Sequence, residues 1–156
     1  DAGGTTLDYP CGAPTVPCAS GRSIGMLAGD GALDEMMVTG SDSEWVWIAI
    51  TDTGGVWSSD ERLHVRLELT SEGGANFDLH TFHASESVTP MARDCDANAT
   101  RSERAAGEMD SVDLSWQDVT NGLFESDGDG RILSVLVRND GTSCEGSWTL
   151  RVMAGE

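Results

Sequence analysis

The strongest constraint on the fold is a repeated alternation of apolar and polar residues. HVRLEL (64–69), SVDLSW (111–116) and SWTLRV (147–152) each place an apolar side chain at every second position. Because successive side chains of a strand point to opposite faces, this period predicts half-buried strands with one face on a core. The apolar members are Val65, Leu67, Leu69, Val112, Leu114, Trp116, Trp148, Leu150 and Val152.

Two other segments, WVWIAI (45–50) and RILSVLV (131–137), are apolar on both faces and are expected to lie centrally. No long amphipathic helix is evident, and SERAAGEM (102–109) would form one or two helical turns at most. Glycine- and asparagine-rich turn signals separate the apolar runs, and these residues supply the positive φ of tight turns. Such signals occur at 53–56, 72–75, 121–122, 127–130 and 139–142. The sequence therefore predicts an all-β fold, an antiparallel two-sheet β-sandwich of the jelly-roll or immunoglobulin-like kind.

The length of 156 residues fits one domain. Residues 1–22 are rich in Gly, Pro, Thr and Ser and are expected to form an N-terminal segment, with the sandwich over 23–156.

The cysteines predict two disulfides. Cys11 and Cys18 flank the turn-rich GAPTVP, which could bring them together in a local disulfide. Cys95 and Cys144 lie in polar, loop-like stretches and are expected to form the second bridge. An even number of cysteines in loops of an acidic, lysine-free chain indicates an oxidising compartment, so a secreted or periplasmic protein is expected. Metal binding by the four cysteines is the alternative, although no pair has C-x-x-C spacing.

The net charge of −18 limits the partners of the chain. Phosphate backbones and anionic lipid surfaces would repel it, so we expect no nucleic-acid partner. No apolar run approaches the roughly 20 residues that span a bilayer, so membrane insertion is not expected. The charge most simply serves solubility, but it would also attract divalent cations or basic partners.

The stretch ANFDLHTFHA (75–84) places Asp78, His80 and His83 close together in sequence. The turn signal EGGA (72–75) precedes it, and its apolar residues favour a strand, on which residues three apart point to opposite faces. His80 and His83 should therefore diverge, whereas Asp78 and His80 share a face and could touch. A metal site would need further ligands from elsewhere, so a surface or edge strand with incidental histidines is the simpler interpretation.

The most plausible ligand is calcium. ESDGDG (125–130) places Glu125, Asp127 and Asp129 at alternate positions, similar to the first half of an EF-hand loop. Leu136 occupies the position of the closing glutamate, so the loop is incomplete, and a plain hairpin turn is the alternative. Trp57, in GGVWSSDE, is the best candidate for an exposed ring that stacks on a sugar. The other four tryptophans fall in predicted strands, where core packing is expected.

The order of the strands resembles the bacterial pre-peptidase C-terminal (PPC) domain, a small β-sandwich attached to many secreted proteases. The resemblance covers roughly 43–153 and is carried by SEWVWIAI, LHVRLEL, NFDLHTFHA, DGRILSVLV and GSWTLRV. Asp78 and Leu79 match the Asp-Leu pair of the family, and Trp148 stands in place of its tyrosine. The resemblance implies a non-catalytic accessory module, and some relatives bind calcium or polymeric substrates.

No catalytic residue is assigned from the sequence, and G-x-S-x-G does not occur. The chain is therefore expected to be a non-catalytic exported binding or accessory module, stabilised by calcium if the acidic loop binds it. An extracellular protein or polysaccharide is the expected partner. The alternatives are a calcium-dependent carbohydrate- or matrix-binding protein and a small secreted hydrolase.

Overall fold

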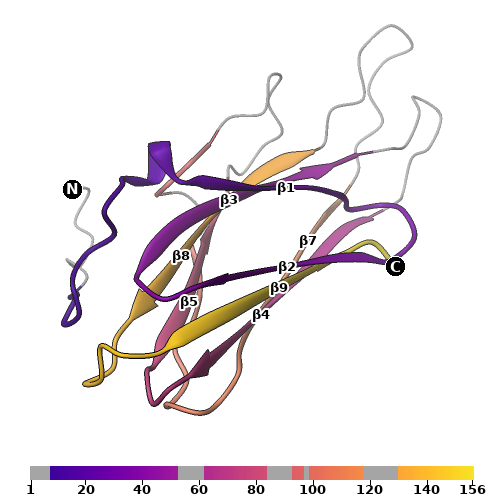
Figure 1. The fold of residues 1–156 in the computed structure, drawn as a ribbon. Helices are drawn as coiled ribbons and strands as arrows, with labels where there is room; N and C mark the ends of the chain where they lie inside the picture. Colours follow the sequence, from indigo (N-terminus) through magenta and orange to yellow (C-terminus); the bar gives the residue numbers. More distant parts are fainter. Residues whose placement is uncertain (1–7, 53–61, 84–92, 97–98, 118–129) are drawn as a thin grey trace, which may run out of the picture.

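The computed structural model describes residues 8–52, 62–83, 93–96, 99–117 and 130–156. In these residues nine strands form two sheets packed face to face, so the predicted β-sandwich is confirmed (Figure 1). Sheet A has the order β1 (Arg22–Ala28), β3 (Glu44–Thr51), β8 (Arg131–Asn139), β5 (Phe77–Phe82), β6 (Thr100–Ser102). Sheet B has the order β2 (Asp34–Gly40), β9 (Ser147–Ala154), β4 (Arg62–Glu72), β7 (Asp110–Gln117). No helix among the described residues has the length and apolarity required to cross a bilayer.

All strand pairs are antiparallel except β1 and β3, which run parallel. The chain reaches β3 from β1 through β2, which belongs to the opposite sheet. In β1 the register shifts between Ser23 and Gly25. Gly25 has a φ of 121°, which glycine adopts without the steric cost that a Cβ would impose.

The core lies between the two sheets, and it confirms the prediction that the alternating apolar residues face inward. The apolar members of the three alternating segments are all buried, while His64, Arg66 and Glu68 lie on the other face of β4. The strands that are apolar on both faces are central, as predicted, because β8 is the middle strand of sheet A and β3 lies beside it.

The tryptophans divide between the core and the outer face of sheet A. Trp116 and Trp148 belong to the core cluster, as predicted. Trp45 and Trp47 are only half-buried, and core packing was the wrong prediction for them. Trp45 packs on Phe82, with ring centroids 5.5 Å apart, and the guanidinium of Arg93 lies 4.2 Å from the ring centroid of Trp47.

The segment 102–109 contains no helical turn. It leaves β6, makes a tight turn in which Glu108 N–H donates to Ala105 O at 3.0 Å, and enters β7. Its polar residues connect the two sheets instead of forming an amphipathic surface.

Each of the four cysteines is in a disulfide, as predicted, but the predicted pairing is wrong. The bridges are Cys11–Cys144 and Cys18–Cys95, so there is no local Cys11–Cys18 bridge. The reason is that the described part of the N-terminal segment, residues 8–21, contacts distant parts of the chain at Arg138 and Arg93. Arg93 Nη1 donates to Ala19 O at 2.6 Å beside the short 3₁₀ helix η1 (Cys18–Ser20).

Candidate functional site

A buried polar cluster lies on the outer face of sheet A, where β5 carries Asp78 and His80. Their neighbours Phe77 and Leu79 point into the core, so the alternation directs both polar side chains away from it. Asp78 is 1% exposed and His80 is fully buried, so the predicted surface or edge strand is wrong. The strand lies between β8 and β6, and side chains from both sides cover its outer face.

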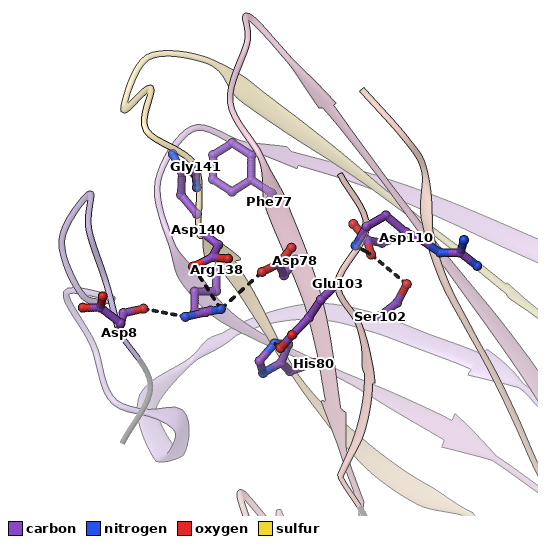
Figure 2. Close-up of polar contacts among 12 residues, drawn as sticks. Asp8, Phe77, Asp78, His80, Ser102, Glu103, Asp110, Arg138, Asp140 and Gly141 are labelled. Carbon is purple, nitrogen blue, oxygen red and sulfur yellow. Dashed lines mark hydrogen bonds and ion pairs between the residues drawn. The ribbon is translucent and has the colours of Figure 1, made fainter. Parts of the chain in front are cut away.

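Arg138 of β8 holds one oxygen of the Asp78 carboxylate. Its Nη2 donates to Asp78 Oδ2 at 3.3 Å and lies 3.2 Å from Asp140 Oδ1, while Nη1 donates to Asp8 O at 2.6 Å (Figure 2). The pKa of Asp78 is raised to about 7, chiefly by burial and then by the nearby Asp140 carboxylate, and Arg138 opposes this shift. Asp78 Oδ1 is buried without a hydrogen-bond partner among the described residues.

The imidazole of His80 meets the carboxylate of Glu103, which follows β6. Figure 2 shows the two side chains converging beside Asp78, and His80 Nε2 lies 3.0 Å from Glu103 Oε1. The contact has the distance of an ion pair but not the direction of a hydrogen bond, since neither ring nitrogen has a hydrogen-bond partner in the described part of the chain. Burial lowers the pKa of His80, and Glu103 opposes this shift, so the ring is neutral near pH 7.

Asp110, at the start of β7, fixes the backbone on both sides of Glu103. Its Oδ1 accepts hydrogen bonds from Ser102 Oγ at 2.7 Å and from Arg104 N–H at 2.9 Å. Burial raises the pKa of Asp110, and these two hydrogen bonds oppose the shift. The side chain of Glu103 remains 47% exposed, so the cluster is accessible from solvent at this position.

Asp78, His80 and Glu103 each offer one potential ligand atom, and these atoms all lie within 4.8 Å of one another. Two carboxylates and a neutral imidazole could hold a metal ion. The sequence showed that Asp78 and His80 share a face. It gave no local signal for Glu103, which lies in the segment interpreted as a helical turn.

The second histidine of the ANFDLHTFHA stretch is not part of this cluster, as its spacing predicted. The ring of His83 stacks on Trp116 at a centroid distance of 5.9 Å, and its Nδ1 lies 3.3 Å from Arg131 Nη1. His80 and His83 therefore lie in different environments, His80 beside Glu103 and His83 against Trp116.

The other residues singled out in the sequence lie outside the part of the chain that the structure describes. This applies to Glu125, Asp127 and Asp129 of the acidic loop and to Trp57. Calcium binding by the loop and sugar stacking by Trp57 stay predictions.

A separate pocket of about 470 Å³ opens on the outer side of sheet B. It combines apolar side chains with a histidine, an arginine and a glutamate: Leu33, His64, Arg66, Met153, Gly155 and Glu156. The remaining outer face of sheet B is solvated and crossed by ion pairs. Arg151 of β9 contacts Glu35 of β2 and Glu68 of β4.

No model of a protein family and no curated protein matches the chain. Several solved structures are weakly similar to it. One is the Aeromonas hydrophila PliG, a periplasmic inhibitor of g-type lysozyme, at a TM-score of 0.40 and 12% identity over 85% of this chain and 95% of that chain. Another is a CBM4 structure, at a TM-score of 0.28 and 10% identity over 77% of this chain and 94% of that chain.

Proposed function

We propose that the chain is an exported binding or accessory module without chemistry of its own. The observation that supports export is the pair of long-range disulfides, which connect Cys11 to Cys144 and Cys18 to Cys95. Bridges of this kind form and persist in oxidising compartments. A secreted or periplasmic location follows from this reasoning.

The outer face of sheet B is the better surface for a partner. The outer face of sheet A is occupied in part by the N-terminal segment, since Arg138 binds Asp8 O and Arg93 binds Ala19 O. Sheet B instead presents solvated strands and the pocket beside Leu33, which is 64% exposed. An apolar surface flanked by charged groups is suited to recognition of a protein or polysaccharide.

The resemblance to the PPC domain supports the accessory role. The five segments that carry it form β3, β4, β5, β8 and β9. An extracellular protein or polysaccharide is the proposed partner class. The net charge of −18 favours partners with basic surfaces, because association of opposite charges is accelerated by their long-range field.

An array of extracellular polysaccharides and basic polypeptides, probed with the labelled chain, tests the binding role. Leu33→Asp should abolish the signal of a partner that binds at the pocket. The matched control is Met26→Asp, because Met26 is similarly exposed at 67% but lies on β1 of the other sheet. Equal binding by both variants and the wild type would exclude the pocket.

A fluorophosphonate probe tests the absence of chemistry in the same sample. A module without a nucleophile gives no covalent labelling, whereas stoichiometric labelling of one serine would overturn the proposal in favour of a hydrolase.

A further inference from the structure

We propose that Asp78, His80 and Glu103 form a binding site for one zinc-class divalent cation on the outer face of sheet A. Such an ion accepts both imidazole nitrogen and carboxylate oxygen. The site is distinct from the calcium loop predicted at 125–130 and from the pocket on sheet B.

The spacing of the donor atoms suits a small metal ion. Bonds of about 2.0–2.2 Å to zinc place neighbouring ligand atoms roughly 3.3–3.6 Å apart in a tetrahedron. The three donor atoms lie within 4.8 Å of one another, and His80 Nε2 is already 3.0 Å from Glu103 Oε1. The side chain of Glu103 is 47% exposed, so it can rotate to adjust its own distance to a bound ion.

Unpartnered buried atoms provide an independent indication of a ligand. Among the described residues, Asp78 Oδ1 and His80 Nδ1 are buried without hydrogen bonds, and His80 Nε2 has only the 3.0 Å contact with Glu103 Oε1, which lacks hydrogen-bond geometry. A buried polar atom without a partner has lost its hydration without compensation, so each such atom in a folded protein requires an explanation. A cation held between the three side chains would bind His80 Nε2 and one carboxylate oxygen of Asp78, and so supply a partner to a buried ring nitrogen.

The surrounding residues hold the ligands in place. Arg138 binds Asp78 Oδ2 and so fixes the position of the Asp78 carboxylate. Asp110 binds the residues before and after Glu103. Outer contacts of this kind orient ligands and raise metal affinity.

The donor set discriminates between metals. Calcium takes six to eight oxygen ligands, and magnesium favours oxygen and retains water, so neither benefits from His80. Zinc combines histidine and carboxylate ligands and accepts three protein ligands with an open position. Bound zinc would connect β5 to the start of the β6–β7 connection, which crosses between the sheets.

The test uses the full chain after chelator treatment and dialysis. Isothermal titration with Zn²⁺, Ca²⁺ and Mg²⁺ should give one zinc per chain and no comparable binding of the other two ions. Glu103→Gln should weaken zinc binding roughly tenfold or more, since the amide is a poor ligand. Glu103 is half-exposed, so this variant should fold, and circular dichroism verifies that it does.

Two controls separate the site from non-specific binding to an acidic surface. Glu108→Gln removes an exposed carboxylate in the same connection, and His64→Ala removes a histidine on sheet B that lies 3.4 Å from Asp113. Both should leave zinc affinity unchanged. Co²⁺ should also give the visible bands of a histidine–carboxylate site, and His80→Gln should remove them.

The proposal fails if zinc does not bind at a one-to-one ratio, or if Ca²⁺ binds more tightly. It also fails if Glu103→Gln binds zinc as well as Glu108→Gln does, because the ions would then be held elsewhere on the surface.

Discussion

Arg138 of β8 and Asp78 of β5 form a buried ion pair across neighbouring strands, with side chains 8% and 1% exposed. The pair does more than neutralise a charge. Arg138 also binds Asp8 O, so it connects the centre of sheet A to the N-terminal segment.

Removing Arg138 should therefore be costly. Arg138→Met leaves Asp78 buried without its partner, and breaking a buried pair from one side typically costs about 3–5 kcal/mol. Chemical denaturation should show a large loss in the free energy of unfolding. The matched control is Arg151→Met, which breaks an exposed pair with Glu35 and a longer, partly exposed contact with Glu68 and should change the midpoint little. Equal losses would contradict the buried role of Arg138.

The disulfide pairing can be tested by peptide mapping without reduction. Trypsin cleaves after Arg22, so Cys11 and Cys18 stay in one peptide, while Cys95 and Cys144 fall in two others. The pairing in the structure joins all three peptides in one assembly. A local bridge would instead release the 1–22 peptide alone. Replacing both Cys18 and Cys95 by Ser should lower the free energy of unfolding by about 2–5 kcal/mol.

Position 40 of β2 requires glycine because the indole of Trp148 packs directly against it. It pairs with Trp148 of β9, and a Cβ at Gly40 would overlap the indole. The ring cannot move freely, because Trp148 Nε1 donates to Asp42 O at 2.9 Å. Gly40→Ala should destabilise the protein by about 1–3 kcal/mol, measured by urea unfolding.

Gly31→Ala is the control for that substitution. A Cβ at Gly31 would meet only Ala28 Cβ at an ordinary 3.6 Å. If both variants unfold at the same urea concentration, the contact between Gly40 and Trp148 does not limit stability.

Asp110 should make stability depend on pH. Its pKa is raised in the folded protein, chiefly by burial, so ionisation is harder in the folded than in the unfolded state. The stability that the protonated Asp110 contributes to the fold is fully present below the unfolded pKa of about 3.9. It is lost as the pH rises through the pKa of Asp110 in the folded protein. Asp110→Asn retains the Oδ1 acceptor for Ser102 and Arg104 without this loss.

The expected result is that wild type is less stable than Asp110→Asn at neutral pH and that the difference shrinks as pH falls. Thermal unfolding of both proteins across this range measures it. A difference that grows on acidification would show that the ionised carboxylate is favoured in the fold.

Much of the fold could be predicted because it depends on local patterns. In β4, β7 and β9 the alternation alone identifies the core residues, such as Leu67, Leu114 and Leu150. In the edge strands β1 and β2 the alternation of apolar and polar residues is weaker. Met26 and Met37 are exposed apolar residues at positions where a polar residue would have identified the outer face.

The site and the disulfides depend on contacts between distant residues. Asp78 and His80 could be placed on one face from their spacing, but nothing near them indicates Glu103 or Arg138. Cys11 pairs with Cys144, which is 133 residues away. The turn residues between Cys11 and Cys18 favoured a local bridge, but Cys18 pairs with Cys95 instead. These contacts arise from tertiary packing, which the local sequence does not encode.

The position of β9 imposes an order on assembly. It lies between β2 and β4, which do not pair with each other directly. Until residues 147–154 have been synthesised, sheet B is therefore two unconnected pieces, and β2 has no hydrogen-bonded neighbour in it. The interior of sheet B can therefore close only after β9 has docked, so the last strand of the described fold completes the sheet.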